Sequence, residues 1–471
     1  MQMKRKIFLI AVAILLAVQS FGQAKYVFYF IGDGMGVNQV NLTELYLGAQ
    51  KGQFGTEKLL FPSFPSGGVA TTWCHDNEVT DSAAAGTALA TGSKTDRANV
   101  GTDPDNNPLT NVAEMAKRSG KKVAILTTVG INDATPAAFY GHQPTRYMSD
   151  ELIKDMAAAD VDFYAGAGFQ RNDGKKYSKC VDDPYALFSE AGFTIAGSVG
   201  DFDAKYASAT KMLMMPDKDH HVYYDIDRDG GSEKYITLKD MVESSIKFLT
   251  KDKKNNGFFI MAEGGAIDHA CHGNDAATVV KEVIDFDAAI HVAYEFYLKH
   301  PKETAIIVTA DHETGGITLN LGKYEKLAKL SLQKSSEGRI TDRLKAQMKQ
   351  KGKEPLTWDE IKAFFAENLG LWKEVRLSPE DELSMFEIYT RTIAQNVAGN
   401  KDDEYGYNHD ASIVSAAIDL FDRIAGVRWS STGHTAGYVP VYAVGVGQEK
   451  FTGRIDNTDI PKKVIEIGRY K

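Results

Sequence analysis

The 471-residue sequence predicts an α/β protein in which a mainly parallel central sheet is covered by helices on both faces. Two observations support this fold class. Several short runs are apolar throughout rather than alternating, as in strands that are buried on both faces. Helical patterns separate these runs, and strands that alternate with helices form parallel sheets. A hydrophobic content of 43% is sufficient for a large core.

Five strands and three helices are expected in chain order. The strands are Tyr26–Ile31, Lys122–Thr128, Phe258–Ala262, Ala305–Thr309 and Val439–Val446. The helices are Leu109–Ser119, Leu238–Leu249 and Ala276–Leu298, of which the last has apolar residues at helical spacing. In a parallel sheet the functional crevice lies outside the carboxyl ends of the strands. Residues that follow each strand are therefore the first candidates for a functional site.

The chain is expected to comprise three parts. Residues 1–22 have the pattern of a secretory signal peptide, because three basic residues precede an apolar run from Ile7 to Val18 that is too short to span a bilayer. Residues 23–320 and 426–471 form the predicted α/β domain. Residues 321–425 are rich in Lys and Glu and predict a helical insertion or cap, or a separate small domain, with helical segments at Tyr324–Leu332, Ile340–Gln350 and Ser378–Gln395.

Charge and cysteine content restrict the partners and the location. Removal of residues 1–22 takes away three positive charges and no acid, which changes the formal net charge from −9 to −12. An acidic protein is not expected to bind a nucleic-acid backbone or an anionic membrane surface. Cys74, Cys180 and Cys271 permit one disulfide at most, and none lies where a lipid anchor would form. We expect an exported protein, periplasmic or secreted, without a membrane span after signal removal.

Potential metal ligands follow four of the expected strands. They occur in Gly32–Gly36, Asn132–Pro136, Glu263–His272 and Ala310–Glu313. Parallel strands bring these clusters to one edge of the sheet, where grouped carboxylates and imidazoles are costly unless a cation joins them. Asp268 and His272 are four residues apart, so both lie on one helix face and suit one zinc ion, with His434 as the third candidate ligand. Without the other motifs, a histidine at this position would more often be a hydrogen-bonded loop residue than a metal ligand.

A second zinc site is expected from Asp33, Asp311 and His312. Two metal ions about 4 Å apart stabilise both the attacking and the leaving oxygen of a phosphoryl displacement. Asp33 together with Thr135 and Glu263 offers only oxygen and suits Mg²⁺, for which Asp133 would hold a bound water.

Ser82 and Arg146 are the candidate residues that act on phosphate. Ser82 precedes a run of small helix-forming residues, Ala83–Leu89, and is expected at a helix N-terminus, which favours an anion. A simple capping role for Asp81 or Ser82 is the alternative. Arg146 would bind two phosphate oxygens through its planar guanidinium. The alternative is that it is an ordinary surface arginine.

The sequence resembles the alkaline phosphatase family of metal-dependent phosphomonoesterases. The resemblance covers about Tyr26–Leu319 and Trp429–Gly447 and rests on the ordered segments Asp33–Gly36, Thr80–Ala84, Asp133–Pro136, Arg146, Glu263–His269, His272, Thr309–His312 and Gly433–Thr435. It implies that Ser82 is the phosphorylated nucleophile and that a zinc-activated hydroxide cleaves the phosphoserine. It also implies two zinc ions and one magnesium ion on the ligand sets given above, with Arg146 binding phosphate.

One departure from the family pattern concerns Asp133 and His269. Well-known bacterial members have aspartate and lysine at these two positions, whereas animal members have histidine at both, so the combination here is mixed. The identity of the third metal and the rate of phosphate release are therefore open. The resemblance implies small-molecule phosphate monoesters as substrates and permits a homodimer, although the helical insertion has no match that would carry over dimer contacts.

Four other functions fit these residues less well. A phosphodiesterase of the same superfamily is the main alternative, and Arg146 with the complete magnesium set favours a monoester. A non-catalytic metal-binding or phosphate-binding protein would be expected to lack a nucleophile or a ligand, and none is missing. Neither the Pro and Arg of the sulfatase motif nor the Gly-x-Ser-x-Gly motif of serine hydrolases surrounds Ser82.

Overall fold

The computed structural model describes residues 22–171, 180–216, 224–228, 235–252, 254, 256–320, 322–352, 354–394 and 413–471. The predicted signal peptide, residues 1–22, lies outside these residues except for Gly22 and stays a prediction. A search of the described helices for one with the length and apolar character to cross a bilayer found none.

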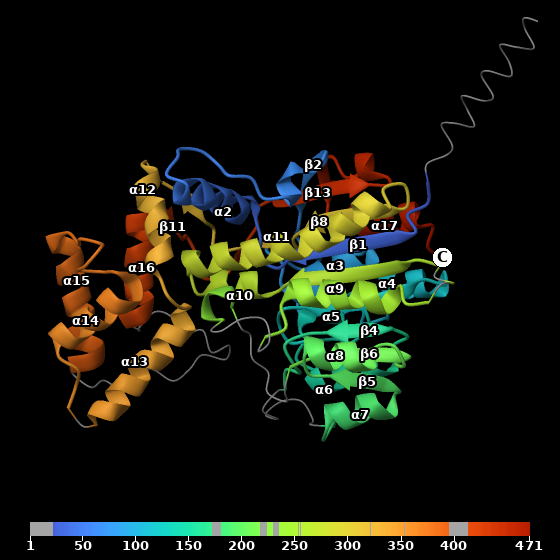
Figure 1. Cartoon of the computed structure of the whole chain (residues 1–471), viewed down its shortest axis with the longest axis horizontal. Helices are drawn as coiled ribbons and strands as arrows, with labels where there is room; N and C mark the ends of the chain where they lie inside the picture. The colour runs from blue at the N-terminus through green and yellow to red at the C-terminus, as the bar shows by residue number, and fades with distance from the viewer. Residues whose placement is uncertain are drawn as a thin grey trace, which may run out of the picture.

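Ten strands of the described chain form one sheet, in the order β14-β2-β13-β8-β1-β7-β3-β4-β6-β5 (Figure 1). Their bounds are β1 Tyr26–Gly32, β2 Ser66–Thr71, β3 Lys122–Thr127, β4 Phe163–Ala165, β5 Phe193–Ala196, β6 Lys211–Met214, β7 Phe258–Gly264, β8 Thr304–Thr309, β13 Val439–Gly445 and β14 Gly453–Asp456. The central strand β1 is parallel to both β7 and β8. Only β13 runs antiparallel to its neighbours, β2 and β8, so the predicted mainly parallel sheet is confirmed.

Alternating side chains of β1 show why its sequence is apolar throughout. Phe28 and Phe30 make edge contacts with Phe296 and Phe286 of α11 (Ala276–Lys299) on one face. Tyr29, which points to the other face, donates a hydrogen bond to the Leu89 carbonyl oxygen of α3 (Ser82–Thr91) at 3.3 Å. Helices therefore cover both faces, and a strand between them has no polar side.

The remaining helices of the α/β part follow the expected alternation. They are α2 Val37–Gln50, α4 Val112–Arg118, α5 Ala134–Ala137, α6 Ser149–Ala158, α7 Pro184–Glu190, α8 Val199–Lys205, α9 Leu238–Leu249, α10 Ala266–His272 and α17 Asp459–Gly468. The three predicted helices correspond to α4, α9 and α11, and the five predicted strands to β1, β3, β7, β8 and β13. Predicted α4 began three residues too early, because Asn111 caps it in a capping box with Glu114.

Residues 321–425 are helical wherever the structure describes them. The elements are α12 Tyr324–Leu327, η3 Ala328–Leu332, α13 Glu337–Lys351, α14 Trp358–Leu369, α15 Pro379–Tyr389, η4 Thr390–Ala394 and α16 Ile413–Ala425. Of these, α14 and α16 were not predicted, and Gln395 of the predicted third segment lies outside the described residues. These helices gather at one end of the molecule (Figure 1, left).

A second apolar cluster connects the helical insertion to the sheet domain. It contains Ile340, Phe365 and Phe421 of the insertion together with Tyr46 of α2 and Ala276 of α11. The strand pair β10 (Thr318–Leu319) and β11 (Val427–Arg428) lies where the insertion leaves and rejoins the α/β part. The insertion thus packs on α2 and on the first turn of α11, and the three-part division of the chain stays a prediction.

The three cysteines are free thiols. Cys74 and Cys271 are buried and Cys180 is exposed, and burial, with a hydrogen bond to Asp76, raises the pKa of Cys74 to about 11. A thiol reagent added to the native protein at pH 8 is therefore expected to modify Cys180 alone, because thiolate and access are both required. Unfolding without reductant should expose three reactive thiols, and a count of one after unfolding would indicate a disulfide instead.

Candidate metal and phosphate site

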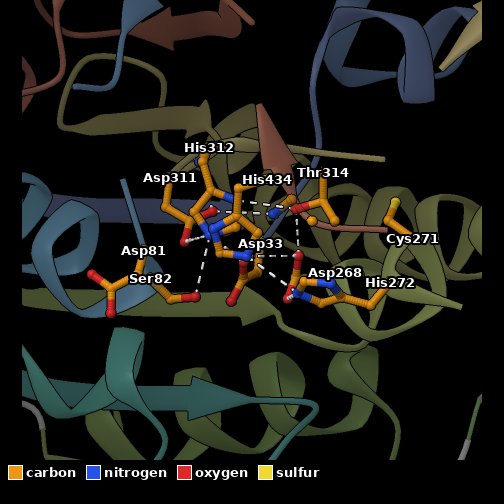
Figure 2. A network of polar contacts seen from close by, with 12 residues as sticks. Asp33, Asp81, Ser82, Asp268, Cys271, His272, Asp311, His312, Thr314 and His434 are labelled. Carbon is orange, nitrogen blue, oxygen red and sulfur yellow. Dashed lines mark hydrogen bonds and ion pairs between the residues drawn. The ribbon is translucent and has the colours of Figure 1, made fainter. Parts of the chain in front are cut away.

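Candidate residues from distant segments meet at the carboxyl ends of the central strands. Figure 2 shows Ser82 together with Asp33, Asp268, His272, Asp311, His312 and His434. Glu263, the second-last residue of β7, pairs in register with Ile31 of β1 and Thr127 of β3, so these strand ends are level. The loops beyond β1 and β8 carry Asp33 and Asp311–His312. Helices α3, α5 and α10 begin at the same edge and carry the other candidates: Ser82, Thr135, Asp268, His269 and His272.

Asp268, His272 and His434 form the first metal group. One potential ligand atom from each lies within 4.8 Å of the others. His272 Nε2 is 3.2 Å from Asp268 Oδ2 and 3.2 Å from His434 Nε2. His434 Nδ1 bonds to the Thr80 carbonyl oxygen at 2.9 Å, and His272 Nδ1 bonds to that of Thr432 at 2.5 Å.

Those carbonyl contacts fix the tautomers of both histidines. A carbonyl oxygen only accepts, so each Nδ1 carries the proton and each Nε2 presents a lone pair. Burial lowers the pKa of His434 to about 4, which keeps its ring neutral at pH 7. Two facing imidazole lone pairs beside a carboxylate fit a divalent cation. Nitrogen and carboxylate oxygen form a donor set that zinc prefers.

Asp33, Asp311 and His312 form the second metal group, again with ligand atoms within 4.8 Å of one another. His312 Nε2 lies 3.1 Å from Asp311 Oδ2 and 3.4 Å from Asp33 Oδ1. Asp311 is held through its other oxygen, which accepts from the backbone N–H groups of Gly34 at 3.1 Å and His312 at 2.9 Å. Burial and the neighbouring Asp311 charge raise the pKa of Asp33 well above its usual range. A cation would remove that repulsion.

Each predicted magnesium ligand has one buried oxygen without a hydrogen-bond partner among the described residues. Asp33 Oδ1, Thr135 Oγ1 and Glu263 Oε1 are buried without a hydrogen bond. Glu263 Oε2 accepts from the Thr127 hydroxyl at 2.5 Å, while burial raises the pKa of this carboxyl. Buried polar oxygens are normally satisfied, and an all-oxygen set fits a hard cation. The chemistry of the donors therefore fits the predicted group.

Ser82 is the first residue of α3, and Asp81 is the cap. The Asp81 carboxylate accepts from the Ala84 N–H at 3.0 Å, which leaves the Ser82 hydroxyl available. Ser82 Oγ lies 3.2 Å from His312 Nε2, on the side of the second metal group (Figure 2). The small residues of α3 have a packing reason, since a Cβ on Gly86 would lie 3.0 Å from Thr135 Cα.

Arg146 and Asp133 form an ion pair beside the serine. Arg146 Nη2 is 2.7 Å from Asp133 Oδ1, and Nη1 is 3.8 Å from Asp81 Oδ2. Gln170 donates to Asp133 Oδ2 at 2.8 Å. The pKa of Asp133 is lowered. Burial acts to raise it, but the opposing effect of the Arg146 and His269 charges is larger, so the carboxylate stays ionised. The structure thus pairs Asp133 directly with the arginine, in addition to the water-holding role expected from the sequence.

Sequence reasoning missed Thr314, which joins the two metal groups. Its hydroxyl donates to Asp268 Oδ1 at 2.5 Å and lies 3.2 Å from His312 Nδ1. A hydroxyl that donates its one proton to Asp268 accepts from His312, so His312 Nε2 is left with the lone pair. The only signal in the sequence is the position of this threonine two residues after His312.

Glu313 and Gln170 were missed as well. Glu313 is buried and accepts from Gln39 Nε2 at 2.9 Å, from Gly316 N–H at 3.0 Å and from the Thr435 hydroxyl. It thereby holds β9 (Glu313–Thr314) against β12 (His434–Thr435), the strand that carries His434. Both residues act through contacts between distant segments, for which the sequence has no signal.

The mainly parallel α/β fold, with carboxylates and histidines grouped at the strand ends, has the features of a metal-dependent hydrolytic enzyme. The alkaline phosphatase family model matches residues 24–164 and 188–470. Alkaline phosphatase 3 of Bacillus subtilis is 32% identical over 466 residues, which are 95% of this chain and 90% of that protein. Alkaline phosphatase 4 of the same organism is 33% identical over 408 residues, 84% and 78% of the two chains. The chain belongs to the alkaline phosphatase family, and it is an enzyme.

Solved structures agree with that assignment. The alkaline phosphatase of Thermus thermophilus has a TM-score of 0.76 at 25% identity and covers 95% of this chain and 92% of its own. The cold-active enzyme of a Shewanella species has a TM-score of 0.75 at 26% identity, with 94% and 99% covered. A TAB5 alkaline phosphatase variant with one histidine replaced by aspartate, TM-score 0.64 at 26% identity and 95% and 99% covered, has Mg bound in its M3 site.

Replacement of Thr314 by valine tests the bridge between the metal groups. Valine keeps the shape but removes both hydrogen bonds, so the affinity for zinc should fall by about 10–100-fold. Competition with a chromophoric chelator measures this affinity. Thr250→Val is the matched control, since this hydroxyl donates to the Ile246 carbonyl oxygen at the end of α9 and belongs to neither metal group. Equal zinc affinity in the Thr314 and Thr250 variants would refute the bridging role.

Proposed function

We propose that this protein is an exported phosphomonoesterase in which Ser82 forms a phosphoserine intermediate. The observation that carries the proposal is the position of Ser82 Oγ, at a helix N-terminus and 3.2 Å from His312 Nε2. Small phosphate monoesters are the proposed substrates. Export is supported by the basic and apolar pattern of residues 4–18.

The proposed metal content is two zinc ions and one magnesium ion. Asp268, His272 and His434 would hold one zinc, and Asp33, Asp311 and His312 the other. Asp33, Thr135 and Glu263 would hold magnesium. This proposal is supported by the orphaned oxygens described above and by the TAB5 variant, an aspartate-containing relative with Mg bound. When bound, such ions neutralise the developing charge on phosphate and on the attacking and leaving oxygens.

Ser82 and α3 carry the covalent step. Ser82 Oγ attacks phosphorus, the bond from phosphorus to the leaving oxygen breaks, and the substrate alcohol departs. Water then attacks the phosphoserine and releases phosphate and the free hydroxyl. The N-terminus of α3 favours the anionic phosphoryl group in both steps, because its backbone N–H groups and helix dipole face the ligand. Two in-line displacements retain the configuration at phosphorus.

Arg146 orients the phosphoryl group. Its guanidinium is held in place by Asp133, which Gln170 fixes in turn. The planar fork can bond two non-bridging oxygens at once, which a monoester offers without obstruction. A diester places a second substituent on one of the phosphate oxygens, so the arginine favours monoesters.

Ser82→Ala tests the nucleophile. Without the Oγ atom no phosphoenzyme can form, so kcat/KM for an aryl phosphate should fall by at least about 10³-fold, the scale of losses when one member of a catalytic set is removed. Zinc and magnesium analysis of the same preparation is the control, because Ser82 is not among the proposed ligands and the metal content should match the wild type. Full activity of this variant, or a wild-type enzyme without zinc, would refute the proposal.

Arg146→Ala separates the monoesterase from a phosphodiesterase. The wild type should hydrolyse a monoester faster than a diester of the same leaving group, and the variant should lose about 10–100-fold on the monoester, as expected when a charged bidentate contact worth about 1.5–3 kcal/mol is removed. The loss on the diester should be smaller. Faster diester hydrolysis by the wild type would favour the phosphodiesterase alternative.

A further inference from the structure

Asp422 of α16 connects the helical insertion to two segments that carry metal ligands. Its side chain is fully buried, with no exposed surface. Oδ2 accepts from the Ala276 N–H at 3.0 Å and from Trp429 Nε1 at 2.8 Å. Ala276 begins α11, four residues after His272, and Trp429 lies five residues before His434. One oxygen atom of the insertion therefore accepts hydrogen bonds from the segment that follows His272 and from the segment that precedes His434.

Trp429 in turn packs where two ligand loops meet. A Cβ on Gly315 would lie 2.5 Å from two atoms of its ring, so the indole occupies the space beside this glycine. The Gly315 N–H donates to the Gly433 carbonyl oxygen at 2.9 Å, and the Ser430 N–H donates to the Gly315 carbonyl oxygen at 3.0 Å. The indole thus braces the loop after His312 against the loop before His434.

We propose that Asp422 is a positioning residue through which the helical insertion holds His272 and His434 at one metal ion. The inference rests on the zinc site of the proposed function and assigns a role to the insertion. Asp422 holds the start of α11, and so the end of α10, at a fixed distance from the Trp429 indole. The two histidine Nε2 atoms, 3.2 Å apart, belong to these two segments.

The second metal group has a different support. Asp311 is fixed by the backbone N–H groups of Gly34 and His312. Asp33 directly follows β1 and Asp311 lies two residues after the end of the adjacent strand β8, and these strands pair over six residues from Tyr26 to Ile31. Loss of Asp422 is therefore expected to weaken the zinc site of His272 and His434 much more than the other, which shares only the Trp429 contact beside Gly315. General destabilisation would weaken both sites alike.

The charge of Asp422 is not needed for this role. Burial raises the pKa of this carboxyl well above its usual range, which favours its uncharged form. An asparagine has nearly the same shape and keeps an oxygen that accepts both hydrogen bonds. Alanine removes that oxygen and leaves the Ala276 N–H and the Trp429 Nε1–H buried without a partner.

The test compares Asp422→Ala and Asp422→Asn in the full-length enzyme, with Asp419→Asn as the matched control. Asp419 lies on the same helix and pairs with Arg423 at an exposed position. Zinc affinities are measured by chelator competition, together with kcat, KM and thermal unfolding. In Asp422→Ala one zinc should bind about 10–100-fold more weakly and kcat should fall, while the other zinc is retained. Asp422→Asn should recover the wild-type affinity, and the control should not differ from the wild type.

Several outcomes would overturn the inference. A folded Asp422→Ala enzyme with both zinc affinities unchanged, or with both weakened equally, refutes it. If that variant does not fold, Trp429→Phe provides the test, since it removes the Nε1 donor and keeps an aromatic ring, and it should weaken the same single zinc. Unchanged affinity there refutes the inference too. A wild-type enzyme that binds no zinc would refute the proposed function itself, so the two failures are distinguishable.

Discussion

Repulsion between buried carboxylates is the constraint around which this structure is organised. Asp33, Glu263 and Asp311 follow or end three adjacent parallel strands, so the sheet brings three buried acidic groups together. Burial raises the pKa of Asp33 and of Glu263, which measures the cost of holding their charges there. Cations at this edge convert that cost into a favourable interaction, and folding and metal binding are then linked.

The same constraint explains why histidines and backbone carbonyls surround the acids. His272 and His434 each donate an Nδ1–H hydrogen bond to a carbonyl oxygen, so in the neutral ring the Nε2 lone pair is turned toward the proposed metal position. The Thr314 hydroxyl accepts the Nδ1–H hydrogen bond of His312 in the same way. Each ligand is oriented before a metal arrives, which reduces the entropy lost on binding. Fixed ligands of this kind require support from outside the sheet, and β9, β12 and the insertion supply it.

How far the sequence predicts this protein depends on the range of each interaction. The apolar runs identified β1, β7 and β8, and the polar residues after them identified the strand-end acids, because both signals are local. Short strands such as β4, with three residues, have too little pattern to detect. Whether Asp81 or Ser82 caps α3 could not be decided from residue type, since both cap well. Thr314 and Asp422 act on partners 46 and 146 residues away, which only the fold brings near.

The ion pair of Arg146 with Asp133 couples the proposed phosphate-binding arginine to the proposed magnesium site. Asp133 is the N-cap of α5, the helix that carries Thr135, and its carboxylate also bonds Gln170. A change in the ion near Thr135 would therefore shift the carboxylate that orients the arginine. His269 lies within electrostatic reach of the same carboxylate, and burial lowers the pKa of its ring. Arg146 is the larger of the two positive influences on the pKa of Asp133 and keeps its charge at any working pH, so the ion pair with Arg146 is the main electrostatic support of this carboxylate.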